Sequence, residues 1–173
     1  MNPKLKLLFA DLELQRQQLI DKVKQSPDSF NKKPTPDKWS VNEILAHLVA
    51  AENLSVQYIL KKKQGIDGAG NTGLIEEIKM NLLTLSQRLP LKFTAPKPVV
   101  SATSAYSSLD ELIQDWDSTR ENLKRILEQI KDDQLKKKIY KHVILGKLNI
   151  IHALKFLGEH MNHHLPQINR LLK

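Results

Sequence analysis

The chain contains no cysteine among its 173 residues. This absence excludes disulfide bonds, zinc sites built from thiolates and cysteine nucleophiles, and it fits the reducing conditions of the cytoplasm. No apolar run approaches the roughly 18 residues that a transmembrane helix needs. The first residues also lack an apolar stretch followed by small residues, so no signal peptide is predicted. We therefore expect a soluble, cytoplasmic protein with no membrane partner.

Aromatic residues are also scarce, with two tryptophans, three tyrosines and four phenylalanines. Basic residues, in contrast, outnumber acidic ones by 27 to 19, which gives a net charge of +8. Such an excess can indicate nucleic-acid binding. The lysines are spread along the chain in short runs, however, and no nucleic-acid-binding motif occurs among them. A solvated basic surface is the favoured interpretation, so we expect no nucleic-acid partner.

Four long segments repeat their apolar residues at intervals of three and four, which predicts four amphipathic helices. They span residues 3–25, 40–63, 108–131 and 149–173. The second segment begins with Ser40 and has Glu43 three residues later, which is the pattern of a capping box. The fourth begins at Asn149, a favourable capping residue. Pro166 lies inside this helix and predicts a kink, because it removes one backbone hydrogen bond.

The connection between the second and third long helices is unusually long. Residues 74–89 are predicted to form a shorter helix, and the prolines that follow predict an extended run through residues 92–95. The segment from His142 to Gly146 is predicted as a turn, and strand signals are almost absent. The expected fold class is all-α: a single domain of residues 1–173 that forms a four-helix bundle, with a short extra helix in the connection between helices 2 and 3.

Histidines in the last segment are candidates for a metal site. Because a helix advances by about 100° per residue, His164 falls within the apolar stripe and His160 falls at its edge, one turn earlier. Two histidines that lie four residues apart on an inward face can present two imidazole nitrogens to one ion. His163 and His152 point away from the stripe, and His152 is expected at the surface.

His47, in the second segment, is the candidate for a third ligand. It lies at the margin of a broad apolar surface, and metal sites in helix bundles are built from inward side chains of facing helices. Three protein ligands with a vacant fourth position are typical of a catalytic metal. From the residues alone the alternative stays open that these histidines are packed, hydrogen-bonded core residues.

Two charged residues, Glu52 and Arg120, occupy positions where a helix normally buries carbon. Because a buried ion needs a partner, we hypothesise that they pair between helices or that one of them faces the pocket. The alternative is that their long side chains extend to solvent. His163 and His142 are further candidates for the surroundings of the pocket, and both tryptophans are expected in the core.

Several sequence stretches carry a family resemblance. Residues 38–48, KWSVNEILAHL, with Glu52 beyond them, resemble the second-helix signature of the DinB/YfiT-like superfamily. Residues 156–168, FLGEHMNHHLPQI, together with KFTAP and WDSTR between the two, fit the same pattern in the same order. Pro166 departs from that pattern.

The resemblance implies a four-helix bundle with an unusual helix order, which allows a homodimer. Many members bind a divalent metal through one histidine on the second helix and two on the last. The matching residues, and therefore the implied metal ligands, are His47, His160 and His164, with zinc or nickel as the expected ion.

The resemblance also implies an activity, because characterised members are mostly thiol-dependent transferases and isomerases. A metal held by three neutral histidines keeps its full charge, so it can stabilise a thiolate or lower the pKa of a bound water. In a chain without cysteine, the sulfur would come from a low-molecular-weight thiol. We expect a thiol S-transferase that acts on a small electrophilic substrate. The alternatives are a metal-dependent hydrolase and a non-catalytic stress-response binding protein of the same fold.

Overall fold

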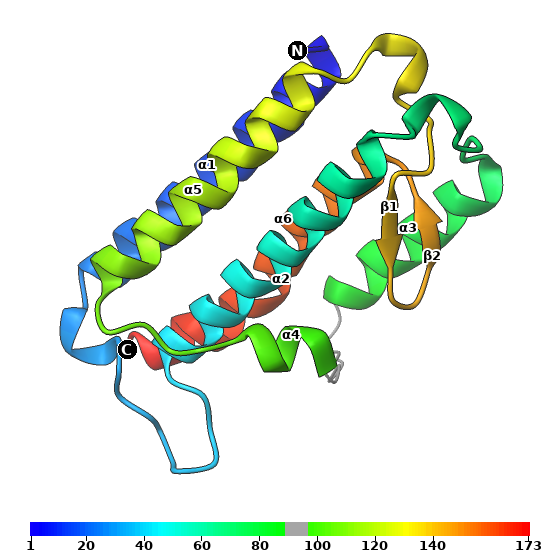
Figure 1. Cartoon of the computed structure of the whole chain (residues 1–173). Coiled ribbons are helices and arrows are strands. Elements are labelled where there is room, and N and C mark those ends of the chain that lie inside the picture. The colour runs from blue at the N-terminus through cyan, green and yellow to red at the C-terminus, as the bar shows by residue number, and fades with distance from the viewer. Residues whose placement is uncertain (89–96) are drawn as a thin grey trace.

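The computed structural model describes residues 1–88 and 97–173. In chain order its elements are α1 (Pro3–Lys24), α2 (Val41–Lys63), α3 (Leu74–Arg88), α4 (Lys97–Ala102), α5 (Leu109–Glu128), β1 (Tyr140–His142), β2 (Gly146–Leu148) and α6 (Ile150–Leu171). Figure 1 shows the four long helices α1, α2, α5 and α6 side by side. The all-α class and the four-helix bundle are thus confirmed, and α3 is the predicted extra helix.

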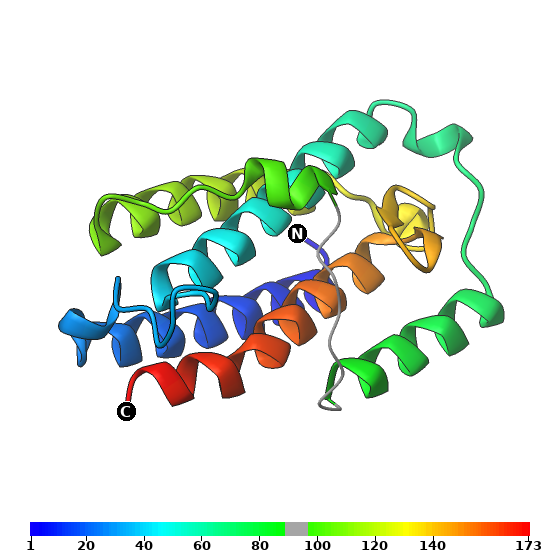
Figure 2. The same ribbon diagram turned by 90° about the horizontal axis from the view of Figure 1, so that it is seen from below.

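The order of the helices explains the long connection. The consecutive long helices α2 and α5 pack against each other and run in the same direction, whereas α1 and α6 run in the opposite direction (Figure 1). Parallel neighbours cannot be joined by a short turn, so the chain has to return along the bundle between α2 and α5. On this route α3 packs against α6 and α4 packs against α2. Figure 2 shows α3 at the α6 side of the bundle, away from α5.

The helix ends follow the predicted capping residues. The Ser40 side chain accepts a hydrogen bond from the backbone N–H of Glu43, and the Glu43 carboxylate accepts one of 2.8 Å from the backbone N–H of Ser40. Asn149 caps α6 in the same way, by accepting from the backbone N–H of His152 at 2.8 Å. The α6 helix runs through Pro166 without interruption. The kink expected there stays a prediction.

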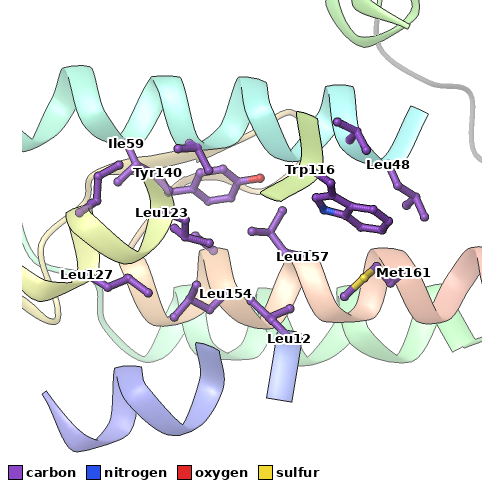
Figure 3. Packing of buried hydrophobic residues seen from close by; sticks show 14 of the residues in the cluster. Leu12, Leu48, Ile59, Trp116, Leu123, Leu127, Tyr140, Leu154, Leu157 and Met161 are labelled. Atoms are coloured by element: carbon purple, nitrogen blue, oxygen red, sulfur yellow. The ribbon is translucent and has the colours of Figure 1, made fainter. Parts of the chain in front are cut away.

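The core lies between the four long helices and is centred on Trp116, whose side chain is fully buried. Figure 3 shows Trp116 close to Leu48 and Met161, with leucines of α1, α5 and α6 filling the space beside it. Burying one such leucine contributes about 1.5–3 kcal/mol to folding. This packing fixes the positions of α2 and α6, which carry the histidines.

The structure differs from the sequence prediction in two connections. Where only a turn was predicted, β1 and β2 form an antiparallel hairpin in which Lys141 pairs with Lys147, and Gly146 has a φ of 80° that suits its turn. The helix α4 was not predicted, because Pro98 was read as part of an extended run. A proline is tolerated in the first turn of a helix, which is where Pro98 lies. The extended run expected at residues 92–95 falls outside the described residues.

Among residues 1–88 and 97–173, no helix is both long and apolar enough to cross a membrane.

Candidate metal centre

Three histidines from two facing helices converge at one point. His47 of α2 and the pair His160 and His164 of α6 each place one imidazole nitrogen within 4.8 Å of the others. Their ring centroids lie 5.1 Å apart in all three pairs, so the rings form a nearly equilateral triangle. The two nitrogens Nε2 of His47 and Nε2 of His160 are 3.2 Å apart. In a tetrahedral zinc site two ligand nitrogens are separated by about 3.3 Å, so this spacing fits a shared ion.

The local structure explains this convergence. His160 and His164 are one helical turn apart, so both side chains lie on the same face of α6. That face meets α2, which packs against α6. His47 lies within the first turns of α2, whose start is fixed by the Ser40 capping box. The prediction that His47, His160 and His164 meet in space is therefore confirmed by the geometry.

Burial keeps the three imidazoles neutral. It lowers the pKa of His47 and His160, and it lowers that of His164 to about 4, with the neighbouring histidines as a second cause. A neutral imidazole has a free lone pair on one nitrogen, which is the form that binds a metal. At neutral pH all three side chains are thus ready to act as ligands, and none has to lose a proton first.

The hydrogen bonds of these rings also suit a metal. Nδ1 of His164 lies 3.3 Å from the side-chain oxygen of Gln167, to which it donates, and this leaves Nε2 of His164 as the acceptor nitrogen. Nδ1 of His47 is buried and has no hydrogen-bond partner in the described part of the chain. The donor set of three imidazole nitrogens fits zinc, nickel and similar divalent ions.

Aromatic rings contact two of the ligands. Trp39, just before α2, is tilted by 52° against the ring of His47, with a centroid distance of 5.4 Å. Phe156 of α6 stacks on His160 at 5.5 Å with only 11° between the ring planes. Neither residue was predicted from the sequence to be part of the site. Phe156 could have been found from its spacing, because it lies one helical turn before His160.

The two further histidines that were predicted near the pocket both contact aromatic or imidazole rings at the site. His163 is 5.2 Å from His164 between ring centroids, and its Nδ1 donates to the backbone carbonyl of Gln87 at the end of α3. His142 of β1 contacts Phe156 edge to face at 4.6 Å, and burial lowers the pKa of His142 to about 4.

The predicted pairing of Glu52 and Arg120 is confirmed. Their side chains are 4% and 3% exposed and form an ion pair. Glu52 also accepts a hydrogen bond of 3.0 Å from the indole N–H of Trp116, and Arg120 donates to Glu13 of α1 at 3.1 Å. The Glu52 carboxylate is therefore engaged with Arg120 and Trp116 inside the core.

The expectation that His152 lies at the surface is wrong. Its side chain is 0% exposed, and its Nε2 lies 2.9 Å from a carboxylate oxygen of Glu77. The helical phase of α6 places His152 away from the bundle core, as predicted. However, α3 packs on that side of α6 and buries it.

Comparison with known proteins identifies the family. The sequence profile of the DinB superfamily matches residues 11–168, a range that includes all three converging histidines. The chain belongs to this superfamily. It is similar to the uncharacterized protein YuaE of Bacillus subtilis (strain 168), with 25% identity over 146 residues that cover 84% of this chain and 85% of the relative. No solved structure matches the chain significantly.

Proposed function

We propose that this DinB-superfamily protein binds a divalent metal ion through His47, His160 and His164. We further propose that it uses the ion to join a low-molecular-weight thiol to a small electrophile. In this step the thiol loses its proton, and its sulfur forms a new bond to the electrophilic carbon, either by addition or with displacement of a leaving group. The observation that carries the proposal is the triangle of three neutral imidazoles, one buried and two half-buried, in which two facing nitrogens are 3.2 Å apart. Zinc or nickel is the expected ion, because both accept imidazole nitrogens.

The charge of the site supports chemistry on an acidic group. Three neutral ligands leave the charge of a divalent ion uncompensated, and such an ion lowers the pKa of a thiol or water that it coordinates. The protein's own part is to hold the three nitrogens in place and to limit the access of water. Trp39 and Phe156 serve the second purpose, since both cover ligand rings with apolar surface.

Three considerations support a thiol as the activated group. The chain has no cysteine of its own, so sulfur chemistry needs a diffusible thiol. The cytoplasm, where we place the protein, is the compartment in which free thiols stay reduced. The resemblance to thiol-dependent members of the superfamily points in the same direction.

Metal analysis of the purified protein tests the site. The wild-type protein should carry one divalent ion per chain, and His47→Ala and His160→Ala should each lose it. His163→Gln is the matched control, because Nδ1 of His163 is hydrogen-bonded to the backbone carbonyl of Gln87. This variant should keep the ion. Unchanged metal content in both alanine variants would overturn the assignment of the ligands.

A screen of low-molecular-weight thiols against an electrophilic reporter tests the reaction. The proposal predicts turnover that needs both the thiol and the metal and that is absent in His47→Ala. Turnover without any thiol would instead support the metal-dependent hydrolase. Metal binding without turnover for any thiol would support a non-catalytic binding protein.

A further inference from the structure

A chain of ring contacts leads from the hairpin to one of the metal ligands. Phe156 and His160 are one turn apart on α6 and their rings are stacked, with 11° between the planes. Phe156 in turn is contacted by His142, at 4.6 Å edge to face, and by Tyr140, at 6.1 Å. Tyr140 and His142 are alternate residues of β1, so both side chains point to the same face of the hairpin.

The hairpin is itself held in shape close to this contact. Nδ1 of His142 accepts hydrogen bonds from the backbone N–H groups of Ile144 and Leu145, at 3.2 and 3.3 Å. These bonds close the turn and fix the orientation of the His142 ring. Lys141, between the two inward residues, is exposed, so the hairpin has one face toward α6 and one toward solvent.

Each of the three ligands has a different neighbour that restricts its ring. His164 donates to Gln167, and His47 is covered by Trp39. For His160 the corresponding neighbour is Phe156. Removing a hydrogen-bonded partner that orients a metal-binding histidine typically weakens metal binding by about 10–100-fold, and loss of a stacked ring that restricts the same imidazole should act in the same direction.

We propose that hairpin β1–β2 is a positioning device for the metal ligand His160. It presses Phe156 against the ring of His160 and so fixes the direction in which this nitrogen points. His142 and Tyr140 are positioning residues, since they act through Phe156. This inference rests on the proposed metal site, and it gives a function to an element that the sequence did not reveal.

The test measures Co²⁺ binding by the full-length protein, with affinity from competition with a chelator and ligand geometry from the visible spectrum. Phe156→Leu should weaken Co²⁺ binding about tenfold and change the spectrum, because a branched aliphatic side chain cannot stack. Phe156→Tyr keeps the ring and should preserve both. His142→Ala should change the Co²⁺ affinity and the spectrum in the same direction as Phe156→Leu, but by a smaller amount.

Ile144→Ser is the matched control in the hairpin, because this side chain is 69% exposed and should change neither quantity. Thermal unfolding of the metal-free variants checks that each one folds. If the wild-type protein binds Co²⁺ and Phe156→Leu binds it with the same affinity and spectrum, the positioning role is wrong. A wild-type protein without Co²⁺ binding would overturn the metal site as well.

Discussion

Two polar clusters lie next to each other on α2, and they differ in the charge of their members. Glu52 belongs to a cluster of ions in which each charge meets an opposite one. The Glu52 carboxylate forms an ion pair with Arg120, and Arg120 forms a second ion pair with Glu13. Glu13 also forms an ion pair with Arg16. His47, five residues earlier, belongs to a cluster of neutral rings whose nitrogens face one another.

The difference separates a structural role from a functional one. Ions taken out of water must be paired to be tolerated, and the first cluster satisfies this requirement within the protein itself. The second cluster instead brings three imidazole nitrogens within 4.8 Å of one another. Convergent imidazole nitrogens from facing helices are an arrangement that can hold a metal ion.

The largest effect should come from breaking the ion cluster. Arg120→Met leaves the Glu52 carboxylate charged and buried without its cation. This should lower the free energy of unfolding by about 3–5 kcal/mol, as measured by urea denaturation. In the double variant Glu52→Leu with Arg120→Met no charge is left unpaired, so most of the loss should be regained. A double variant no more stable than the single one would show that the pair stabilises the fold by itself.

The histidine cluster should respond to metal instead. With free metal at about 100 times its dissociation constant, the free energy of unfolding should rise by about 2.7 kcal/mol, because only the folded chain forms the site. The increase should be absent in His47→Ala. In the metal-free protein this variant should cost less stability than Arg120→Met. Calorimetry with and without zinc measures the stability of each protein and its increase on metal binding. An equal increase in His47→Ala and in the wild-type protein would contradict a metal-binding role for the histidine cluster.

The capping box provides a change that acts on both clusters alike, because it fixes the start of the helix that carries them. Ser40→Ala should cost about 1 kcal/mol of stability, since the backbone N–H of Glu43 loses its acceptor. Ser40→Gly should cost only a few tenths of a kcal/mol relative to serine. Urea denaturation of the metal-free protein gives these values, and equal losses in the two variants would argue against the cap.

The smallest effect should come from a carboxylate at the surface. Hydrogen bonds from the backbone N–H of Gly73 and from Lys138 lower the pKa of Glu76 from 4.5 to about 2. The folded chain therefore holds this carboxyl group ionised at a pH where the unfolded chain protonates it. Its contribution is fully present above about pH 5.5 and is lost as the pH falls toward 2. Glu76→Gln should reduce the fall in stability over this range in acid titrations, and an unchanged slope would contradict the assignment.

Sequence periodicity was sufficient for most of the fold and for the three converging histidines. The long helices carry regular apolar stripes and clear caps, and helical phase alone places His160 and His164 on one face. It also indicated the pairing of Glu52 with Arg120, because both occupy positions on apolar faces. In each of these cases the signal is contained in a single helix.

The features that were missed depend on packing between elements. The strands of the hairpin are only three residues long, which is too short for an alternating pattern to stand out. His152 was misplaced because its burial depends on α3, which its own helix does not reveal. The roles of Trp39 and Phe156 likewise follow from what lies against them in space.

The separation of the ligands along the chain has a consequence for assembly. His47 and His160 are 113 residues apart, and α6 is synthesised after α1, α2 and α5. During translation a chain without α6 holds only one of the three nitrogens, so it cannot retain an ion at this site. The site is therefore completed only after α6 has docked against α2. A chain that ends before His160 would lack the centre entirely, however well its first three long helices fold.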